Sequence, residues 1–215
     1  PRKNIKLFLG KPIISYPLEI IKNNFKSINI HISTEDKEIL EYINYLGYKV
    51  DFKRPFNLSG DLIPALDVIN FIYEEYKKKG LNYSHIINIP PTSVFCSKEI
   101  IEDAINLSRL NPQKIIIPVK EFNVPIDSSY YFDTKTKKLI PYSLENFSSN
   151  TQNFGRNVYD AGVLAIIPSE LLSFRKNNKL ISDSLLGLKI NDLVIDIDDP
   201  QDWQIAENVY KASKL

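Results

Sequence analysis

The sequence predicts an α/β fold with a mostly parallel sheet and helices on both faces. Short apolar runs rich in β-branched residues alternate with amphipathic stretches along most of the chain, which is typical of consecutive βα units. The 215 residues are 43% hydrophobic and 25% charged, enough for one domain with a full core. This rhythm breaks at residues 121–155, which predicts an excursion from the core of that single domain, 1–215.

The elements of the first half follow from apolar spacing and helix-capping residues. Strands are expected at residues 28–33, 48–52 and 85–89, and helices at residues 35–46 and 64–79. Gly47 and Gly80 follow the two helices, as expected for C-terminal capping glycines. Ser97 is the expected N-cap of the next helix.

The second half is expected to begin with a strand at residues 114–119 and to continue with the excursion. Within the excursion, residues 130–142 form an apparent hairpin with a polar tip. A lone hairpin is marginally stable, so we expect it to pack on a second subunit. Further strands are expected at residues 161–167 and 189–197, with a short helix beginning at Pro168 between them. Asp199 is the expected N-cap of the last helix and Pro200 its first residue.

Composition argues against several classes of protein. The net charge of +1 argues against general electrostatic binding of nucleic acid or of anionic membranes. One cysteine, Cys96, permits neither an internal disulfide nor a multi-cysteine zinc site. No apolar run approaches the ~20 residues of a membrane span. We therefore expect a soluble cytoplasmic protein. Because the sequence contains no Met at all, we expect it to be a fragment that lacks a phosphate-binding loop before Pro1.

The strongest candidates for chemistry lie near the two ends of the chain. Asp196 and Asp198 are two residues apart on an expected strand, so their carboxylates should share one side and could hold Mg²⁺. Lys3 could neutralise phosphate charge. The alternatives stay open, because surface lysines are common and acidic turns often precede helices.

Weaker candidates lie in turns and at the ends of strands. Such positions bind ligands in open α/β sheets, but each of these segments could instead be a turn or a helix cap. The candidates are Arg54, Ser59, Gly60, Thr92, Ser93, Gln152, Asp160 and Gly162. His31 and His85 stand alone in expected strands, where packing explains them better than catalysis, and no nucleophile is expected at Cys96.

Taken together in order and spacing, several short segments resemble the acylneuraminate cytidylyltransferase family, and within it the pseudaminic acid branch. The segments are Pro1-Arg2-Lys3-Asn4, Arg54-Pro55, Leu58-Ser59-Gly60-Asp61, Pro91-Thr92-Ser93, Asp160-Ala161-Gly162 and Asp196-Ile197-Asp198. The resemblance implies a Rossmann-like nucleotidyltransferase fold with a mixed, mainly parallel sheet. It also implies a homodimer in which the excursion reaches the partner. The implied reaction couples CTP, with Mg²⁺, to a nonulosonic acid, giving the CMP-sugar and pyrophosphate.

The resemblance also implies roles for individual residues. Lys3, Asp196 and Asp198 would be catalytic, with the two aspartates holding the metal. The nucleotide would be bound by Arg2, Lys3, Asn4, Arg54, Ser59, Gly60 and Asp61. The sugar would be bound by Thr92, Ser93, Gln152, Asp160 and Gly162.

The chain departs from the family pattern where Pro90, Cys96 and Asn150 stand in place of Gln, Arg and Arg, and where Leu62-Ile63-Pro64-Ala65 replace small hydroxyl residues after Asp61. Two alternatives therefore remain. One is a cytidylyltransferase for an eight-carbon keto acid sugar, and the other is a non-catalytic paralogue that binds a nucleotide or a sugar. Retention of both Asp196 and Asp198 argues against the second.

Overall fold

The computed structural model describes residues 3–60, 62–145 and 157–213. Its centre is a five-stranded sheet in which the order is β3–β8–β4–β7 and β9 pairs with β4. The strands are β3 (His85–Asn88), β4 (Ile115–Glu121), β7 (Val158–Asp160), β8 (Ala165–Pro168) and β9 (Leu185–Lys189). An α/β fold with a mixed central sheet is thus confirmed.

Within this sheet, antiparallel pairs outnumber parallel ones. Among the described strands β4 and β9 form the parallel pair, while β3–β8, β4–β8 and β4–β7 are antiparallel. Strands β3, β4 and β9 still run in one direction, as βα units require. The difference arises because the chain reverses direction between β4 and β7, so that β7 and β8 both run antiparallel to β4, with β8 between β3 and β4. The expectation of mainly parallel pairing is therefore not met among these strands.

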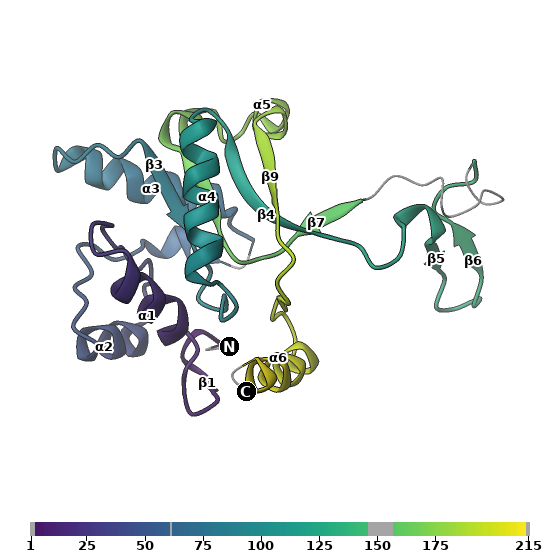
Figure 1. Ribbon diagram of the computed structural model, residues 1–215. Helices are drawn as coiled ribbons and strands as arrows, with labels where there is room; N and C mark the ends of the chain where they lie inside the picture. Colours follow the sequence, from purple (N-terminus) through teal and green to yellow (C-terminus); the bar gives the residue numbers. More distant parts are fainter. Residues whose placement is uncertain (1–2, 61, 146–156, 214–215) are drawn as a thin grey trace.

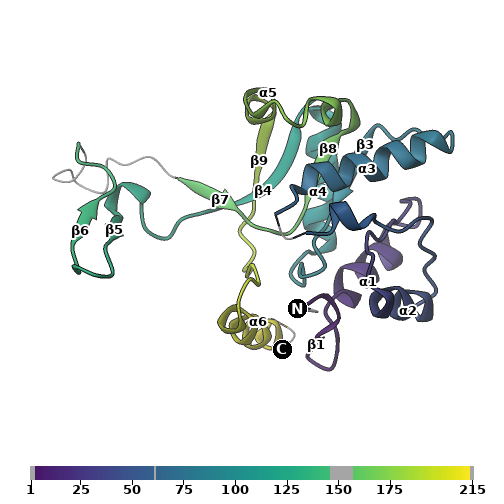
Figure 2. The same cartoon turned by 180° about the vertical axis from the view of Figure 1, so that it is seen from behind.

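Helices cover both faces of the sheet (Figures 1 and 2). On one face, α4 (Lys98–Leu110) packs on Ile116 and Ile166. On the other, α3 (Ala65–Lys78) and η5 (Ser169–Phe174) pack on Ile115 and Ile167. Adjacent residues of one strand therefore enter opposite cores, as the period of two requires.

The remaining helices are α1 (Ser15–Asn24), α2 (Lys37–Tyr45), α5 (Asn178–Asp183) and α6 (Pro200–Ala212). The capping predictions are confirmed. Ser97 accepts a hydrogen bond from the N–H of Ile100, and Asp199 caps α6 with Pro200 at its start. Gly47 and Gly80 follow α2 and α3 with φ of +83° and +78°. The helix expected at 35–46 begins later because Asp36 is its N-cap. The short helix at Pro168 is η5.

Two predicted strands in the first half are wrong. Residues 28–33 and 48–52, all of them described, form no strand. Their alternating apolar side chains instead pack on α1 and α2, in a cluster that includes Ile30, Ile32, Tyr48 and Val50. Burial against helices produces the same apolar alternation as a half-buried strand, which explains the error.

Two strands of the second half are displaced from their predicted positions. Within the predicted strand 161–167, residues 161–164 form a bend, and strand β8 begins only at Ala165. In place of the strand expected at 189–197, β9 ends at Lys189 and the chain continues without strand pairing. Ile195 and Ile197 still face the core, and Ile197 is fully buried. The aspartates therefore lie on an irregular segment.

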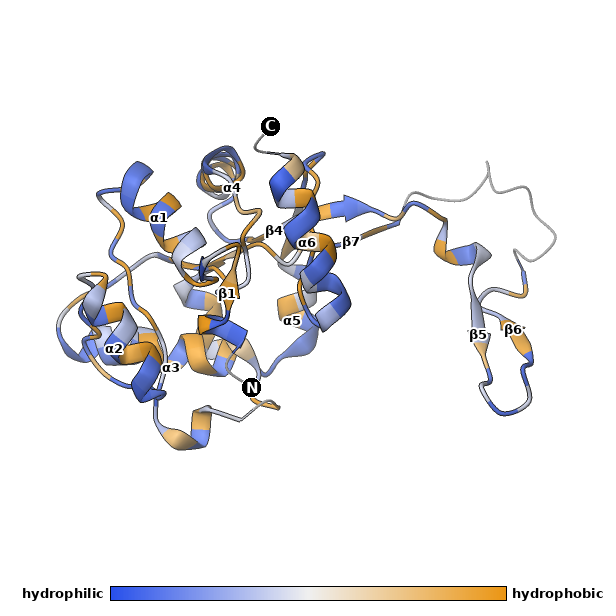
Figure 3. Ribbon diagram, turned by 90° about the horizontal axis from the view of Figure 1, so that it is seen from below, coloured by the Kyte–Doolittle hydropathy of each residue, from blue (hydrophilic) through white to orange (hydrophobic). Residues whose placement is uncertain are grey.

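An arm projects from the body of the molecule (Figure 1). It carries η3 (Ile126–Ser128) and the predicted hairpin, formed by β5 (Tyr130–Phe132) and β6 (Leu139–Pro141). Figure 3 colours parts of this hairpin as hydrophobic. Its exposed large side chains are Tyr130, Tyr131, Phe132, Leu139, Ile140 and Tyr142. None of the described helices has the length and apolar character needed to cross a membrane.

Candidate active site

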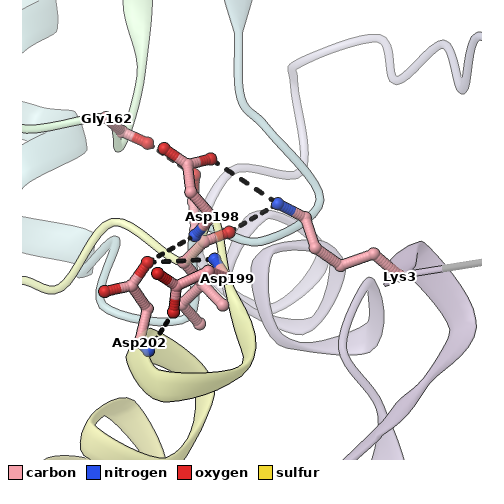
Figure 4. A network of polar contacts seen from close by, with 7 residues as sticks. Lys3, Gly162, Asp198, Asp199 and Asp202 are labelled. Carbon is pink, nitrogen blue, oxygen red and sulfur yellow. Dashed lines mark hydrogen bonds and ion pairs between the residues drawn. The ribbon is translucent and has the colours of Figure 1, made fainter. Parts of the chain in front are cut away.

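Lys3 meets the carboxylate segment from the far end of the chain. It begins η1 (Lys3–Ile5), and its ammonium group donates a hydrogen bond to the carbonyl of Ile197. The same Nζ lies 3.7 Å from Oδ1 of Asp198 (Figure 4). The structure therefore brings together the three residues predicted to be catalytic around one backbone carbonyl.

An aromatic cluster holds these two ends together. Phe8 lies in β1 (Leu7–Phe8), which forms a tight hairpin with β2 (Lys11–Pro12). Its ring makes edge contacts with Tyr16, Trp203 and Tyr210, at centroid distances of 5.3, 5.5 and 5.7 Å. Such pairs contribute about 0.5–1.5 kcal/mol each beyond the burial of their area. Ile197 belongs to the same cluster, so packing fixes the segment that carries both aspartates.

The two acidic residues that follow are occupied by the start of α6. Asp199 accepts from the N–H groups of Gln201 and Asp202, at 2.7 and 2.9 Å. Asp202 in turn accepts from the N–H groups of Asp198 and Asp199, both at 3.0 Å. This capping box fixes the backbone of Asp198 and leaves its carboxylate 81% exposed. The capping of α6 therefore leaves the Asp198 side chain available as a candidate ligand.

Asp196 lies against the bend that follows β7. Gly162, in that bend, has φ of +68°, and a Cβ atom there would stand 2.9 Å from Oδ2 of Asp196. The N–H of Gly162 donates to Oδ1 of Asp160 at 2.8 Å, and its carbonyl accepts from Oγ of Ser93 at 3.3 Å. Three residues predicted to bind the sugar are thus linked to one another beside a predicted metal ligand.

The charges around Asp196 favour a cation. Partial burial raises the pKa of Asp196, and the negative charge of Asp198 raises it further. Lys3 opposes this shift, and Asp160 adds to it. No group of three or more His, Cys, Asp or Glu side chains in the described part of the chain is arranged to hold a metal. Two carboxylates alone suit Mg²⁺, which completes its octahedron with waters and phosphate oxygens.

Arg54 belongs to a second cluster. Its Nε and Nη2 atoms both donate to Oε2 of Glu35, at 2.8 and 2.6 Å. Burial raises the pKa of Glu35, but hydrogen bonds from Arg54, its own backbone and Ser59, with the charge of Arg54, outweigh burial and lower it. Sequence reasoning missed Glu35, because an acidic residue before a helix looks like a first-turn residue. The presence of Arg54 could have pointed to Glu35, because a half-buried arginine needs an anionic partner.

The other predicted site residues have ordinary structural contacts. Ser59 follows η2 (Phe56–Leu58) and also donates to the carbonyl of Pro55. Gly60 is exposed, and a Cβ there would make only an ordinary contact with Ile63. The carbonyl of Asn4 accepts from the N–H of Ile14, and that of Thr92 from the N–H of Val94. Arg2, Asp61 and Gln152 lie outside the described residues.

Cys96 and the two histidines lie outside both clusters. Cys96 is 1% exposed, and burial raises the pKa of its thiol to about 12, so it is a poor nucleophile. His85 contacts the carbonyl of Pro112 at an exposed edge. His31 is stacked on Phe52 and hydrogen-bonded to the hydroxyl of Tyr76. Packing explains these three residues, as expected.

Comparisons with known proteins identify relatives of similar sequence. Two of them align over almost the whole chain. One is a pseudaminic acid cytidylyltransferase of Campylobacter jejuni subsp. jejuni serotype O:2, 29% identical over 99% of this chain and 91% of its own length. The other is a CMP-N,N'-diacetyllegionaminic acid synthase of Legionella pneumophila subsp. pneumophila, 22% identical over 100% of this chain and 91% of its own length.

Solved structures support the fold. CMP:2-keto-3-deoxy-manno-octonic acid synthetase complexed with CTP superposes with a TM-score of 0.72 at 11% identity, covering 99% of this chain and 92% of that one. A 4-diphosphocytidyl-2C-methyl-D-erythritol synthase from Anaerococcus prevotii gives 0.60 at 13% identity, covering 97% and 93%. The fold is therefore that of nucleotidyltransferases, as expected. The cytidylyltransferase family model matches residues 1–162, three-quarters of the chain, and the chain belongs to the cytidylyltransferase family.

Proposed function

We propose that the protein transfers CMP from CTP to a nonulosonic acid of the pseudaminic type. The observation that carries this is Lys3 beside the Asp196–Asp198 pair, in a chain of the cytidylyltransferase family. The identity to a pseudaminic acid enzyme, 29%, exceeds that to a legionaminic acid enzyme, 22%, and favours the first substrate. A cytoplasmic location is part of the proposal, because CTP is a cytoplasmic metabolite.

In this reaction the anomeric hydroxyl oxygen of the sugar attacks the α-phosphorus of CTP. The bond from that phosphorus to the bridging oxygen breaks, pyrophosphate leaves with the electron pair, and the hydroxyl proton passes to solvent. Asp196 and Asp198 would hold Mg²⁺, which supplies positive charge that stabilises the phosphate oxygens. Lys3 adds a fixed positive charge beside them, and positioned charge is the main source of catalysis in such transfers.

Arg54 would bind the nucleotide, with Glu35 fixing its guanidinium plane. In this proposal the residues assigned to the sugar by the family resemblance are Thr92, Ser93, Gln152, Asp160 and Gly162. Asn4, Ser59 and Gly60, with Arg2 and Asp61, complete the proposed nucleotide contacts.

The test is pyrophosphate release from CTP and Mg²⁺ with pseudaminic, legionaminic, N-acetylneuraminic and eight-carbon keto acid sugars. We expect release with pseudaminic acid and a strong loss in a Lys3→Ala variant. Pyrophosphate release with the eight-carbon keto acid sugar alone would identify the protein as a cytidylyltransferase for that sugar instead. No release and no binding of CTP would mean a non-catalytic paralogue.

We further propose that the active form is a homodimer assembled through the arm. The support is the row of aromatic and aliphatic side chains that β5 and β6 leave in water, which is unusual for a monomer. Sedimentation at micromolar concentration should give twice the mass of the 24.8 kDa chain. Ile140→Asp on the hairpin should yield monomers, whereas the exposed Leu110→Asp on the body should not. A monomeric wild-type protein would contradict this proposal.

A further inference from the structure

Gly162 stands where no other residue fits without displacing Asp196. A Cβ at this position would lie 2.9 Å from both Cγ and Oδ2 of Asp196 and 3.1 Å from Oδ1. Real Cβ atoms essentially never approach another heavy atom within 3.0 Å. The φ of +68° adds a second requirement, because side chains with a Cβ disfavour the left-handed region.

The backbones on the two sides of this contact are anchored in the core. Asp196 lies between Val194 and Ile197, which are 8% and 1% exposed. On the other side, Ala161 and Val163 flank Gly162 and are 3% and 1% exposed. A methyl group at position 162 would therefore push the carboxylate out of its place, since the two backbones are anchored in the core.

Two side chains hold the peptide groups of Gly162. Asp160 accepts its N–H at 2.8 Å, and Ser93 donates to its carbonyl at 3.3 Å. Ser93 is 3% exposed, so its hydroxyl faces the interior. Because both residues hydrogen-bond to the backbone of Gly162, they fix that backbone beside the Asp196 carboxylate.

We propose that Gly162 is the positioning residue for the Asp196 carboxylate, and that Asp160 and Ser93 brace it. This inference rests on the proposed function, in which Asp196 holds Mg²⁺. It assigns Asp160 and Ser93 to the support of the metal site rather than to direct contact with the sugar. Outer residues that fix a ligand are often nearly as important for metal affinity as the ligand itself.

The experiment measures CTP affinity by calorimetry with and without Mn²⁺, in the absence of sugar. The readout is the gain in CTP affinity that Mn²⁺ produces. Gly162→Ala should reduce this gain roughly tenfold or more while metal-free CTP affinity stays within about twofold of wild type. Gly80→Ala is the matched control, because Gly80 also has positive φ, +78°, with nothing within 4 Å of a Cβ. It should keep the gain, although both variants are strained.

Asp160 variants test the brace separately. Asp160→Asn keeps an oxygen that can accept the N–H of Gly162, whereas Asp160→Ala does not. We expect the alanine variant to lose part of the Mn²⁺-dependent gain and the asparagine variant to retain it. Equal losses of the Mn²⁺-dependent gain in both variants would mean that the charge of Asp160 acts directly on the site. That result would contradict the proposal that Asp160 braces Gly162.

The outcomes distinguish the positioning role of Gly162 from the proposed function of the protein. A Gly162→Ala protein with the full gain would overturn the positioning role and leave the proposed function standing. A wild-type protein that binds CTP without any gain from Mn²⁺ would overturn the metal assignment and the positioning role together.

Discussion

At the scale of single residues, the site depends on which carboxylates are free. Four aspartates lie within residues 196–202, and two of them are occupied by capping α6. Asp198 keeps its backbone in the capping network and its side chain in solvent near Lys3. The capping box thus selects the pair that remains available to a cation.

Asp198→Ala should therefore reduce turnover roughly 100-fold or more, because the proposed site would lose a carboxylate that holds positive charge beside the phosphates of CTP. Thermal unfolding should be almost unchanged, since the side chain is exposed. Asp192→Ala removes an exposed aspartate from the same segment and should leave the rate of pyrophosphate release unchanged. Full activity of Asp198→Ala with Mg²⁺ would exclude the residue as a metal ligand.

The Glu35–Arg54 pair gives a second prediction at this scale. Glu35→Gln keeps an acceptor oxygen but loses the charge that strengthens both hydrogen bonds, so KM for CTP should rise about fivefold with kcat almost constant. Asp67→Asn is the matched control, because Arg175 donates to Asp67 at 2.6 Å with similar exposure elsewhere in the fold. An unchanged KM in Glu35→Gln would show that Arg54 needs no partner.

At the scale of elements, the helices with clear capping residues were predictable, whereas α5 and several strands were not. Helix caps act locally, so Asp199 with Pro200 and Ser97 could be identified from neighbours in the sequence. Strand pairing is decided by distant segments. The alternating isoleucines of residues 28–33 meet helices instead of a second strand.

In the candidate site, too, local features were predictable and long-range contacts were not. The shared side of Asp196 and Asp198 could be predicted, because Ile197 between them is buried whether or not the segment pairs as a strand. The contact between Gly162 and Asp196 was not, since it joins segments 34 residues apart through a left-handed bend. Glu35 was missed for the same reason, since its partner lies on another loop.

The cap of α6 supplies a prediction for an element. Asp199→Ala should destabilise the protein by about 1 kcal/mol and lower Tm by roughly 2–4 °C. It should also lower activity, because Asp199 caps the helix turn that carries Asp202, and the carboxylate of Asp202 accepts the N–H of Asp198. Ser97→Ala removes the cap of α4 and should cost similar stability without the same loss of turnover. Equal rates of pyrophosphate release in Asp199→Ala and Ser97→Ala would show that the cap of α6 has no specific effect on catalysis.

At the scale of the whole molecule, His31 couples stability to pH. Burial lowers the pKa of His31; Asp51 opposes this shift and Lys79 adds to it. The unfolded chain therefore binds a proton more readily, beginning near the ordinary histidine pKa of about 6.5. The contribution of neutral His31 to the free energy of unfolding is fully present above that pH. It is lost as the pH falls from there through the lower pKa of the folded state.

Urea unfolding between pH 7 and pH 5 tests this coupling. Wild-type protein should lose more stability over this interval than His31→Phe, which cannot titrate and keeps a ring to stack on Phe52. The absolute stability of the variant at pH 7 is not the readout, because it also loses the hydrogen bond to Tyr76. Identical pH slopes would show that His31 does not carry the effect.

The meeting of Lys3 with Asp198 has a consequence for biosynthesis. The two residues lie 195 positions apart, so a nascent chain cannot complete the site until α6 has left the ribosome. Contacts of such sequence separation form late, because closing the loop costs entropy before packing repays it. In the proposed site, nucleotide binding during translation should therefore require a nascent chain that extends through Asp198, and shorter nascent chains should leave cellular CTP unbound.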